Sequence, residues 1–205
     1  MKTLRLYPTN INQRYMDEIV SVLDNGGLVI YPTDSLYAIG CDALDNRAIE
    51  RLCRIKGLNP AKNRLSVVCS DISQASEYAR IDNRAYGILR SHLPGCYTFL
   101  LPAASTLPKA FKGRRTVGVR IPDNAVARAI TEALGRPVMT TSIDVSGLDP
   151  DDIEQPDSIA LRYDNLADLM VDGGLGECVP STVIDLTDSS APEVIRMGKG
   201  LWNEQ

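Results

Sequence analysis

Hydrophobic and polar positions follow two different spacings along this chain. Apolar residues recur with helical spacing from Tyr15 to Leu23 and stop before Gly26, which predicts a helix. The short apolar run Leu28–Tyr31 then predicts a buried strand. The same reasoning predicts helices at 46–55, 73–79, 82–90 and 123–134, strands at 65–69, 97–101, 116–121, 137–141 and 169–172, and a hairpin formed by 182–186 and 194–197. Because strands and helices alternate, we predict an α/β fold in which helices cover a sheet.

Two polar stretches, 105–115 and 148–158, interrupt this pattern, and we interpret both as loops. The second is acidic and interrupted by proline. No repeat, linker or low-complexity segment divides the sequence. We therefore predict a single domain over residues 1–205, with a core from about residue 10 to 200.

The composition is that of an ordinary globular protein, with 44% hydrophobic and 23% charged residues. It excludes collagen-like, disordered and disulfide-stapled classes of protein. The longest apolar runs fall far short of the ~20 residues that cross a bilayer, and the N-terminus lacks a secretory signal pattern. We expect a cytoplasmic protein without a membrane partner.

The formal net charge of -4 averages over two opposite regions. Residues 47–64 contain six basic side chains and one acidic side chain, and residues 109–120 contain five basic side chains and none that is acidic. Residues 149–193 contain twelve acidic side chains and only Arg162 as a base. A basic run is often only a solvated helix face, but this distribution favours an anion site within residues 47–120.

Cysteine and histidine chemistry has little support in the sequence. The five cysteines, Cys41, Cys53, Cys69, Cys96 and Cys178, show no C-x-x-C spacing, and His92 is the only histidine. This pattern argues against a zinc site and against nucleophilic catalysis by a Cys–His or Ser–His pair, and it favours free, buried thiols. The sequence also lacks a Walker-type phosphate loop and a G-x-G-x-x-G motif.

Three polar segments follow predicted strands, at Pro32–Ser35, Thr140–Asp144 and Pro180–Thr182. Ligands of α/β proteins gather at strand ends, where hydroxyls and free backbone N–H groups hold phosphate or carboxylate oxygens. Taken singly, each segment fits serine and threonine side chains that cap turns better than it fits a binding site. Their combination favours a binding site.

Several motifs resemble those of the YrdC/YciO superfamily in order and spacing. They are Tyr31–Asp42, Ile55–Gly57, Pro94–Thr98, Val117–Pro122, Thr140–Ser142 with Ser146–Gly147, Asp172–Gly174 and Ser181–Asp185. The resemblance extends over about residues 10 to 200. It implies a YrdC-like fold, with a twisted mixed sheet, helices packed on it and a concave basic face.

The resemblance also implies an activity. Well-known members of the superfamily are threonylcarbamoyl-AMP synthases, nucleotidyltransferases that use ATP, L-threonine and bicarbonate and release pyrophosphate. Their product is an intermediate for threonylcarbamoyladenosine in tRNA. Other members resemble double-stranded RNA binders, so RNA is a second expected partner, as tRNA or as a duplex.

Residue roles are carried over from the resemblance. Lys56 would hold a phosphate or the oxygens derived from bicarbonate, and Thr33 would fix threonine or the neighbouring phosphate. Other expected ligand contacts are the side chains of Tyr37, Thr98, Arg120, Thr141, Ser142, Ser181, Thr182 and Arg196. Such a site works by positioning substrates and neutralising charge, and it needs no strong general base.

Two positions depart from the synthase pattern. Leu58 stands where that branch carries arginine, and Asp144 stands where it carries asparagine, which makes the YciO-like branch the nearer relative. We hypothesise that Arg64 replaces the missing guanidinium and that Asp144 recruits Mg²⁺ through oxygen coordination. With Lys56 and Ser142, these two residues form the expected catalytic set. A non-catalytic module that binds RNA or nucleotide is the alternative function, because a fold does not fix an activity. A protein whose polar strand ends only cap turns is the third interpretation.

Overall fold

The computed structural model describes residues 1–59, 66–107, 115–147 and 149–202. Within them, ten strands form one mixed sheet in the order β1-β8-β2-β3-β7-β4-β6-β5-β9-β10. The strands are β1 (Lys2–Arg5), β2 (Val29–Tyr31), β3 (Ala38–Asp42), β4 (Ser66–Val68), β5 (Tyr97–Pro102), β6 (Thr116–Arg120), β7 (Val138–Ser142), β8 (Leu169–Asp172), β9 (Thr182–Asp185) and β10 (Glu193–Arg196). The predicted α/β class and mixed sheet are confirmed.

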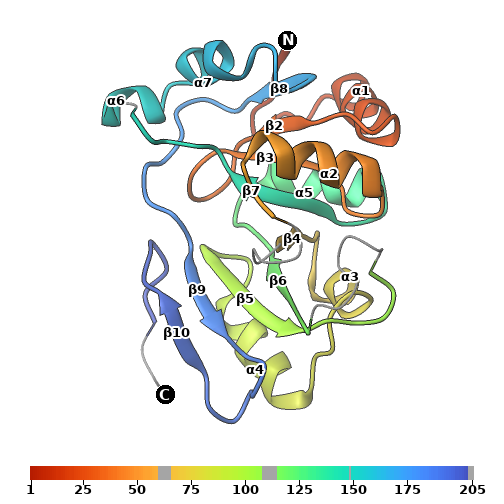
Figure 1. The fold of residues 1–205 in the computed structure, drawn as a ribbon, viewed down its shortest axis with the longest axis vertical. Helices are drawn as coiled ribbons and strands as arrows, with labels where there is room; N and C mark the ends of the chain where they lie inside the picture. Colours follow the sequence, from red (N-terminus) through yellow and green to blue (C-terminus); the bar gives the residue numbers. More distant parts are fainter. Residues whose placement is uncertain (60–65, 108–114, 148, 203–205) are drawn as a thin grey trace.

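The sheet divides into an upper and a lower half (Figure 1). In the upper half, β8 lies between β1 and β2 and pairs with both in parallel, and β3 joins β2 to β7 through antiparallel pairs. In the lower half, β5 is antiparallel to β6 and parallel to β9, which forms the predicted hairpin with β10. The short strand β4 connects the halves, since it pairs with both β7 and β6.

The first five of the seven described helices lie close to the predicted positions, and the last two were not predicted. The seven are α1 (Gln13–Asp24), α2 (Asn46–Ile55), α3 (Ile72–Ser76), α4 (Asn83–His92), α5 (Ala125–Leu134), α6 (Pro150–Ile153) and α7 (Pro156–Tyr163). The Asp45 carboxylate caps α2 by accepting the N–H groups of Arg47 and Ala48 at 2.8 and 3.2 Å. Gly135 ends α5 in the left-handed conformation, at φ 69°, which favours glycine.

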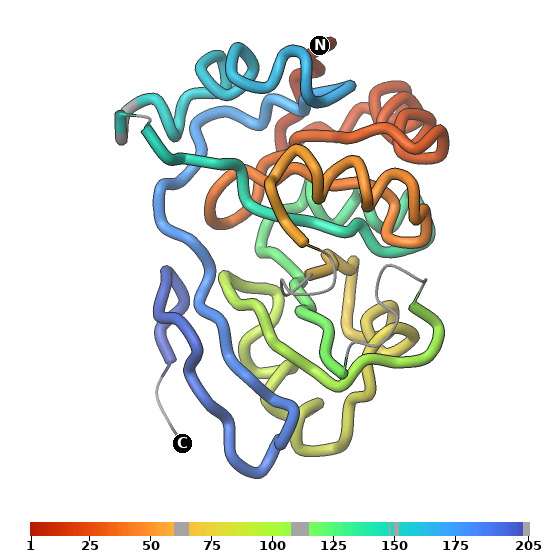
Figure 2. The backbone as a smooth tube through the Cα atoms, in the orientation of Figure 1, coloured from red at the N-terminus to blue at the C-terminus, as the bar shows by residue number. Residues whose placement is uncertain are grey.

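Helices cover both faces of the upper sheet, as the tube in Figure 2 makes visible. Along β2, Val29 and Tyr31 belong to a core cluster with Ile19 of α1 and Ile130 of α5. Ile30 belongs to a second cluster, which includes residues of α2 and continues into the lower half. Burial of each such side chain contributes roughly 1.5–3 kcal/mol. Successive side chains of β2 point to opposite faces of the sheet, so this one strand packs against helices on both faces.

The predicted loop over 148–158 is wrong, because α6 and the start of α7 lie there. Proline interrupts a helix only in its interior, and Pro156 occupies the first turn, where its missing N–H costs nothing. Ile153 and Ile159 are buried and hold this segment against the core. The other predicted loop, 105–115, lies largely outside the described residues.

Two strands were not predicted from the sequence. In β1 only Leu4 is buried, so its pattern is weak, and β3 follows a turn-like segment. Gly40 in β3 permits close packing, since a Cβ there would come 2.5 Å from Val138 Cγ1 and 2.8 Å from the Met139 oxygen. The whole of β3 is buried at the centre of the upper sheet.

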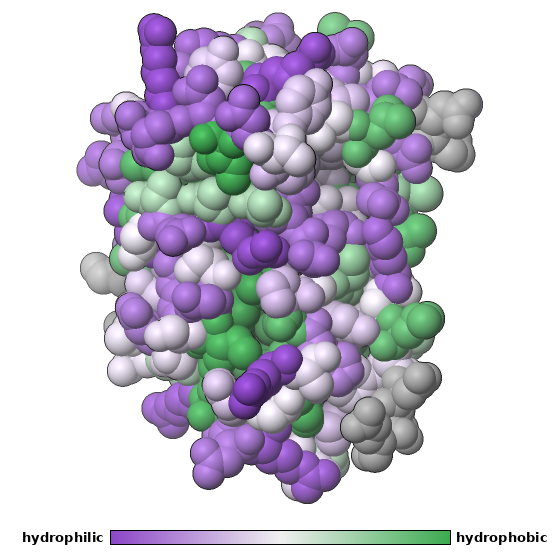
Figure 3. All heavy atoms as spheres, turned by 180° about the vertical axis from the view of Figure 1, so that it is seen from behind, coloured by the Kyte–Doolittle hydropathy of each residue, from purple (hydrophilic) through white to green (hydrophobic). Residues whose placement is uncertain are grey.

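The surface is largely hydrophilic, and seen from behind it shows hydrophobic side chains in separate patches (Figure 3). The described helices are too short and too polar to cross a membrane. The five cysteines form no disulfide with one another; Cys41, Cys53 and Cys69 are buried as predicted, whereas Cys178 is exposed and Cys96 only half-buried.

Candidate functional site

A cavity of about 520 Å³ lies where the lower half of the sheet meets β7 of the upper half, and we call it the sheet cavity. Six residues that the sequence singled out line it: Thr98, Arg120, Thr141, Ser142, Ser181 and Arg196. They come from β5, β6, β7, β10 and the residue before β9. Segments far apart in the sequence therefore meet at one site.

Strand register explains why most of these side chains share a face, with Thr141 of β7 as the exception. Leu100 lies opposite Gly118, and Ser66 lies opposite both Gly118 and Thr140. Residues directly opposite one another on paired strands point to the same side of the sheet. We call this face of the strands the floor of the sheet cavity. Gly118 is packed tightly on it, because a Cβ there would come 2.3 Å from the Ser66 hydroxyl oxygen. Glycine is thus required by space at this position.

Two hydroxyls meet at the junction of β5 and β9. The oxygens of Thr98 and Ser181 lie 2.8 Å apart, and both side chains are buried. Only one of the two hydroxyl protons is used between them, so the other remains able to donate to a ligand oxygen.

Two guanidinium groups border the same hydroxyls. Arg196 donates to the Ser181 carbonyl oxygen at 2.7 Å through Nη2 and at 3.3 Å through Nε. Burial lowers the pKa of Arg196 below its ordinary value, and the positive charge of Arg120 lowers it further. The two arginines are therefore close enough to repel one another.

Arg120 is anchored on its other side by the Pro32–Ser35 segment. Its Nη2 donates to the Asp34 carboxylate and to the Ser35 hydroxyl, each at 3.0 Å. Its Nε is buried without a hydrogen-bond partner. Among the described residues, Arg120 has one carboxylate partner and Arg196 forms no ion pair, and this surplus of positive charge favours an anionic ligand. Asp34 and Ser35 escaped the sequence prediction, although their segment was singled out.

The sheet cavity also has an apolar wall. Leu58, Leu100, Val183 and Ile195 line it together with the polar side chains. Binding sites commonly combine apolar walls with a few placed polar groups. The sequence signal for this wall was the two-residue spacing of Thr98 and Leu100 on β5, which puts both side chains on the same face of the strand.

Lys56 and Asp144 lie beside the residues of the sheet cavity rather than among its lining. Lys56 is the C-cap of α2, and burial lowers its pKa, an effect that the negative charge of Asp144 partly offsets. The pKa of Asp144 is lowered chiefly by hydrogen bonds from Ser146, with smaller effects of Lys56 and Arg162. The two predicted catalytic groups are thus electrostatically coupled.

Asp144 is a poor ligand for Mg²⁺. Its Oδ1 accepts the N–H and the hydroxyl of Ser146 at 3.0 and 2.7 Å, and its Oδ2 accepts Arg162 Nη2 at 3.3 Å. The described part of the chain contains no group of three or more His, Cys, Asp or Glu side chains suited to a metal ion. Asp144 and its neighbours therefore do not fit a resident Mg²⁺ ion. Binding of Mg²⁺ together with the phosphates of ATP stays a prediction.

Three other predicted ligand contacts do not line the sheet cavity, and their hydroxyls already have partners. Thr33 donates to the Leu36 carbonyl oxygen at 2.7 Å and accepts the Ser35 N–H at 3.0 Å. Tyr37 donates to the Gly174 carbonyl oxygen at 2.7 Å, and Thr182 donates to that of Gly200 at 2.6 Å. These bonds fix the loops around the site. Arg64 lies outside the described residues.

A mixed α/β sheet with a hydroxyl-lined cavity that also holds two arginines defines the class of this protein and its candidate site. The family model described as "Telomere recombination" (Sua5, YciO and YrdC) matches residues 21–198. The chain belongs to this Sua5/YciO/YrdC family.

Individual relatives agree over nearly the whole chain. The uncharacterized protein YciO of Escherichia coli strain K12 is 39% identical over 197 residues, which are 95% of this chain and 94% of that protein. The crystal structure of E. coli YciO superposes with a TM-score of 0.88 at 37% identity, covering 98% of this chain and 97% of that one. P. abyssi Sua5, crystallised with L-threonine, gives a TM-score of 0.84 at 29% identity, but the match covers 96% of this chain and only 57% of that one.

Proposed function

We propose that this chain is a threonylcarbamoyl-AMP synthase that binds ATP, L-threonine and bicarbonate in the sheet cavity. The observation that carries this proposal is the pair Arg120 and Arg196 around the hydroxyls of Thr98 and Ser181. Membership of the Sua5/YciO/YrdC family and the L-threonine bound to P. abyssi Sua5 support the choice of reaction.

The reaction has two steps. In the first, bicarbonate loses one oxygen as water and gives CO2, the unprotonated amine of threonine attacks the carbon of CO2, and the nitrogen releases a proton, which leaves a carbamate. A carbamate oxygen then attacks the α-phosphorus of ATP, and the bond from that phosphorus to pyrophosphate breaks. The departing pyrophosphate carries away the electron pair of this bond, so no oxidant or reductant is needed.

The residues contribute by placing charge. Arg120 and Arg196 offset the negative charge on the phosphates, and the Thr98 and Ser181 hydroxyls orient ligand oxygens. Lys56 supplies a further positive charge beside the cavity, and the wall that includes Leu58 and Ile195 suits the adenine ring or the threonine methyl group. The product would serve threonylcarbamoyladenosine formation in tRNA.

One observation favours the alternative function, a module that binds nucleotide or RNA without turnover. Leu58 brings an apolar side chain into the sheet cavity where the synthase branch is expected to have arginine. Asp144 is committed to Ser146 and Arg162. The predicted concave basic face would be the RNA surface in this case.

Pyrophosphate release from ATP tests the proposal. We expect release that requires both threonine and bicarbonate, and Arg196→Gln should reduce it by about ten-fold or more because a guanidinium contact to phosphate is lost. Arg47→Gln, on an exposed position of α2, is the matched control and should retain the rate. Absent release together with salt-sensitive binding of duplex RNA would establish the alternative.

A further inference from the structure

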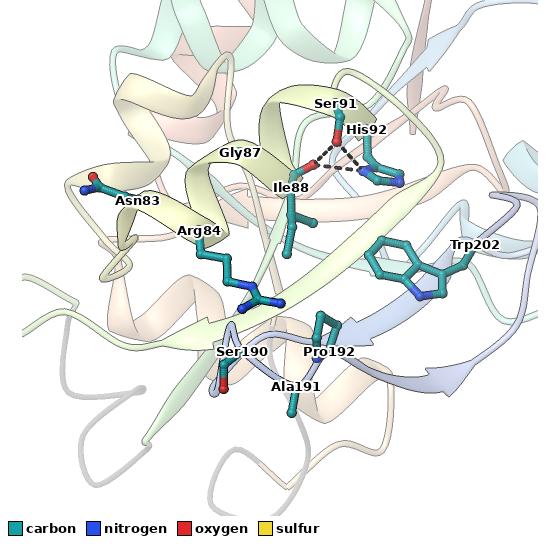
Figure 4. Close-up of a pocket in the computed structure, with 10 residues that line it drawn as sticks. All are labelled: Asn83, Arg84, Gly87, Ile88, Ser91, His92, Ser190, Ala191, Pro192 and Trp202. Atoms are coloured by element: carbon teal, nitrogen blue, oxygen red, sulfur yellow. Dashed lines mark hydrogen bonds between the residues drawn. The ribbon is translucent and has the colours of Figure 1, made fainter. Parts of the chain in front are cut away.

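A second cavity, of about 710 Å³, lies under α4 and is separate from the residues discussed so far. We call it the α4 cavity. Its walls come from α4, from the turn before β10 and from Trp202 (Figure 4). It lies on the opposite face of β5 from the sheet cavity, because Phe99 packs toward Trp202 whereas Thr98 and Leu100 line the sheet cavity. A ligand here would not occupy the proposed active site.

One wall of the α4 cavity is formed by the aromatic rings of Trp202 and His92. The rings of Trp202 and His92 lie 4.8 Å apart at an angle of 32°, and Phe99 supports Trp202 edge-on at 6.3 Å. A ring held from behind in this way offers a fixed surface for stacking.

His92 is itself fixed in place. Its Nδ1 lies 2.8 Å from the carbonyl oxygen of Ile88, which can only accept a hydrogen bond. The same Nδ1 lies 2.9 Å from the Ser91 hydroxyl oxygen, so two contacts with α4 fix the orientation of the ring.

Gly87 keeps the neighbouring surface of α4 bare. Glycine weakens the interior of a helix, and a Cβ at this position would meet nothing within 4 Å. Gly87 lines the cavity together with Ile88. The missing side chain therefore leaves open a space over which a flat group fits.

Arg84 supplies the charge at the rim of the cavity. It extends from α4 toward the Ser190–Pro192 turn (Figure 4). Among the described residues, no salt bridge joins its guanidinium to a carboxylate. Two carboxylates lie nearby: Asp82 accepts a hydrogen bond from the Ser189 hydroxyl, and Asp188 accepts one from the Ser190 hydroxyl. Hydrogen bonds are the main cause of the lowered pKa of both carboxylates, and the positive charge of Arg84 has a smaller effect in the same direction. Because these carboxylates accept serine hydroxyls and do not pair with Arg84, its guanidinium keeps N–H donors for a ligand phosphate, and the two negative charges nearby disfavour a polyphosphate more than a single phosphate.

We propose that the α4 cavity binds a nucleotide, with its base stacked on Trp202 and its single phosphate on Arg84. Stacking on an aromatic side chain together with an arginine contact is a general mode of nucleotide recognition. The nucleotide could be a free nucleoside monophosphate or one residue of a single-stranded RNA. The proposal does not depend on synthase activity in the sheet cavity.

Trp202 is the only tryptophan, so its fluorescence reports directly on this cavity. We expect AMP and a 5′-phosphorylated single-stranded RNA tetramer to quench it, and adenosine or ribose 5-phosphate to quench it only at higher concentration. Tighter binding of the tetramer than of AMP identifies RNA as the source, and equal or weaker binding identifies the free nucleotide.

Variants locate the signal. Arg84→Gln should weaken AMP binding by about ten-fold, and Gly87→Leu should block it by filling the space. Arg90→Gln, on an exposed position of the same helix, should bind AMP like the unaltered chain. Circular dichroism checks that each variant is folded. If Gly87→Leu does not fold, the AMP affinity of Arg84→Gln tests the proposal by itself.

Two outcomes would overturn the proposal. One is the absence of quenching by either probe at millimolar concentration. The other is quenching that Arg196→Gln abolishes and that Arg84→Gln and Gly87→Leu leave intact, because the nucleotide would then lie in the sheet cavity. Pyrophosphate release is measured separately, so failure here leaves the synthase proposal unaffected.

Discussion

Arg120 and Asp34 form a buried ion pair, with Nη2 3.0 Å from Oδ1 and with side chains only 6% and 7% exposed. The other carboxylate oxygen of Asp34 accepts the N–H of Asp123 at 2.7 Å. The Asp34 carbonyl oxygen accepts Lys199 Nζ at 3.0 Å. A single residue after β2 therefore positions the cavity arginine, the start of the α5 segment and the C-terminal segment.

The first prediction concerns this ion pair. Asp34→Asn leaves the buried Arg120 charge without its counter-ion, and we expect the free energy of unfolding to fall by about 3 kcal/mol. Urea denaturation followed by circular dichroism measures it. Asp123→Asn is the control: its ion pair with Arg128 is largely exposed on the aspartate side, so the loss should stay below about 1 kcal/mol. Equal losses in the two variants would refute a special role for Asp34.

The second prediction separates two neighbouring hydroxyls. Thr98→Val removes a hydroxyl that faces the sheet cavity but keeps the side-chain shape, so nucleotide affinity should fall about ten-fold while stability changes by about 1 kcal/mol. Thr182→Val removes a hydroxyl that donates to Gly200 and accepts the Gly198 N–H at 2.9 Å, so it should cost about 2 kcal/mol of stability.

Calorimetric titration with ATP and thermal unfolding distinguish the two effects. The interpretation fails if Thr182→Val lowers affinity in a protein that is fully folded and as stable as the unaltered chain. It also fails if Thr98→Val binds ATP with unchanged affinity.

The third prediction is a pH dependence at Lys56. Because burial lowers the pKa of Lys56 in the folded state, the folded protein binds this proton less tightly than the unfolded chain does. The resulting penalty is fully present below the folded-state pKa and disappears as the pH rises to the unfolded value of 10.5. Lys56→Met should therefore raise the free energy of unfolding at pH 7, and this gain should shrink as the pH approaches 10.5.

The same variant should release less pyrophosphate than the unaltered chain, since the positive charge beside the cavity is lost. Denaturation at a series of pH values measures the first effect and the ATP assay the second. Arg54→Met, exposed on the same helix, is the control and should show neither. A stability gain at Lys56 that does not vary with pH would indicate better packing instead of relief from a buried charge.

The fourth prediction concerns the floor of the sheet cavity. Gly118→Ala places a Cβ where the Ser66 hydroxyl lies, so we expect a loss of about 1–3 kcal/mol and weaker ligand binding. Ser66→Ala removes the clashing oxygen, and the double variant should recover most of the stability. A double-mutant cycle by urea denaturation measures this coupling. Additive losses would show that the two side chains do not compete for one space.

Much of the fold follows from local pattern. The helix from Asn46 to Ile55 and the strand from Leu169 to Asp172 have the predicted bounds, because each combines a regular apolar period with a clear terminal signal. The loop prediction for the acidic segment that contains α6 and α7 was wrong, since Pro150 and Pro156 are the first residues of these helices and do not break them. The strand β1 offers only one buried side chain, and its partner β8 is remote in sequence.

The site was predictable as a set of residue types but not as a geometry. Hydroxyls and arginines were identified from motifs, yet the sequence does not distinguish Thr98, which faces the cavity, from Thr182, which fastens the C-terminal segment. That difference arises from pairing between β5 and β9, which no local pattern encodes. The partnership of Asp144 with Ser146 and Arg162 likewise depends on how α7 packs.

The position of β8 between β1 and β2 affects how the chain folds during synthesis. Lys2 pairs with Leu169, so the first strand has no partner on this side until most of the chain has left the ribosome. Until then β2 also lacks one neighbour, and both edges are open to pairing with other chains. Contacts this distant in sequence slow folding, so completion of the upper sheet is expected to be a late, post-translational step.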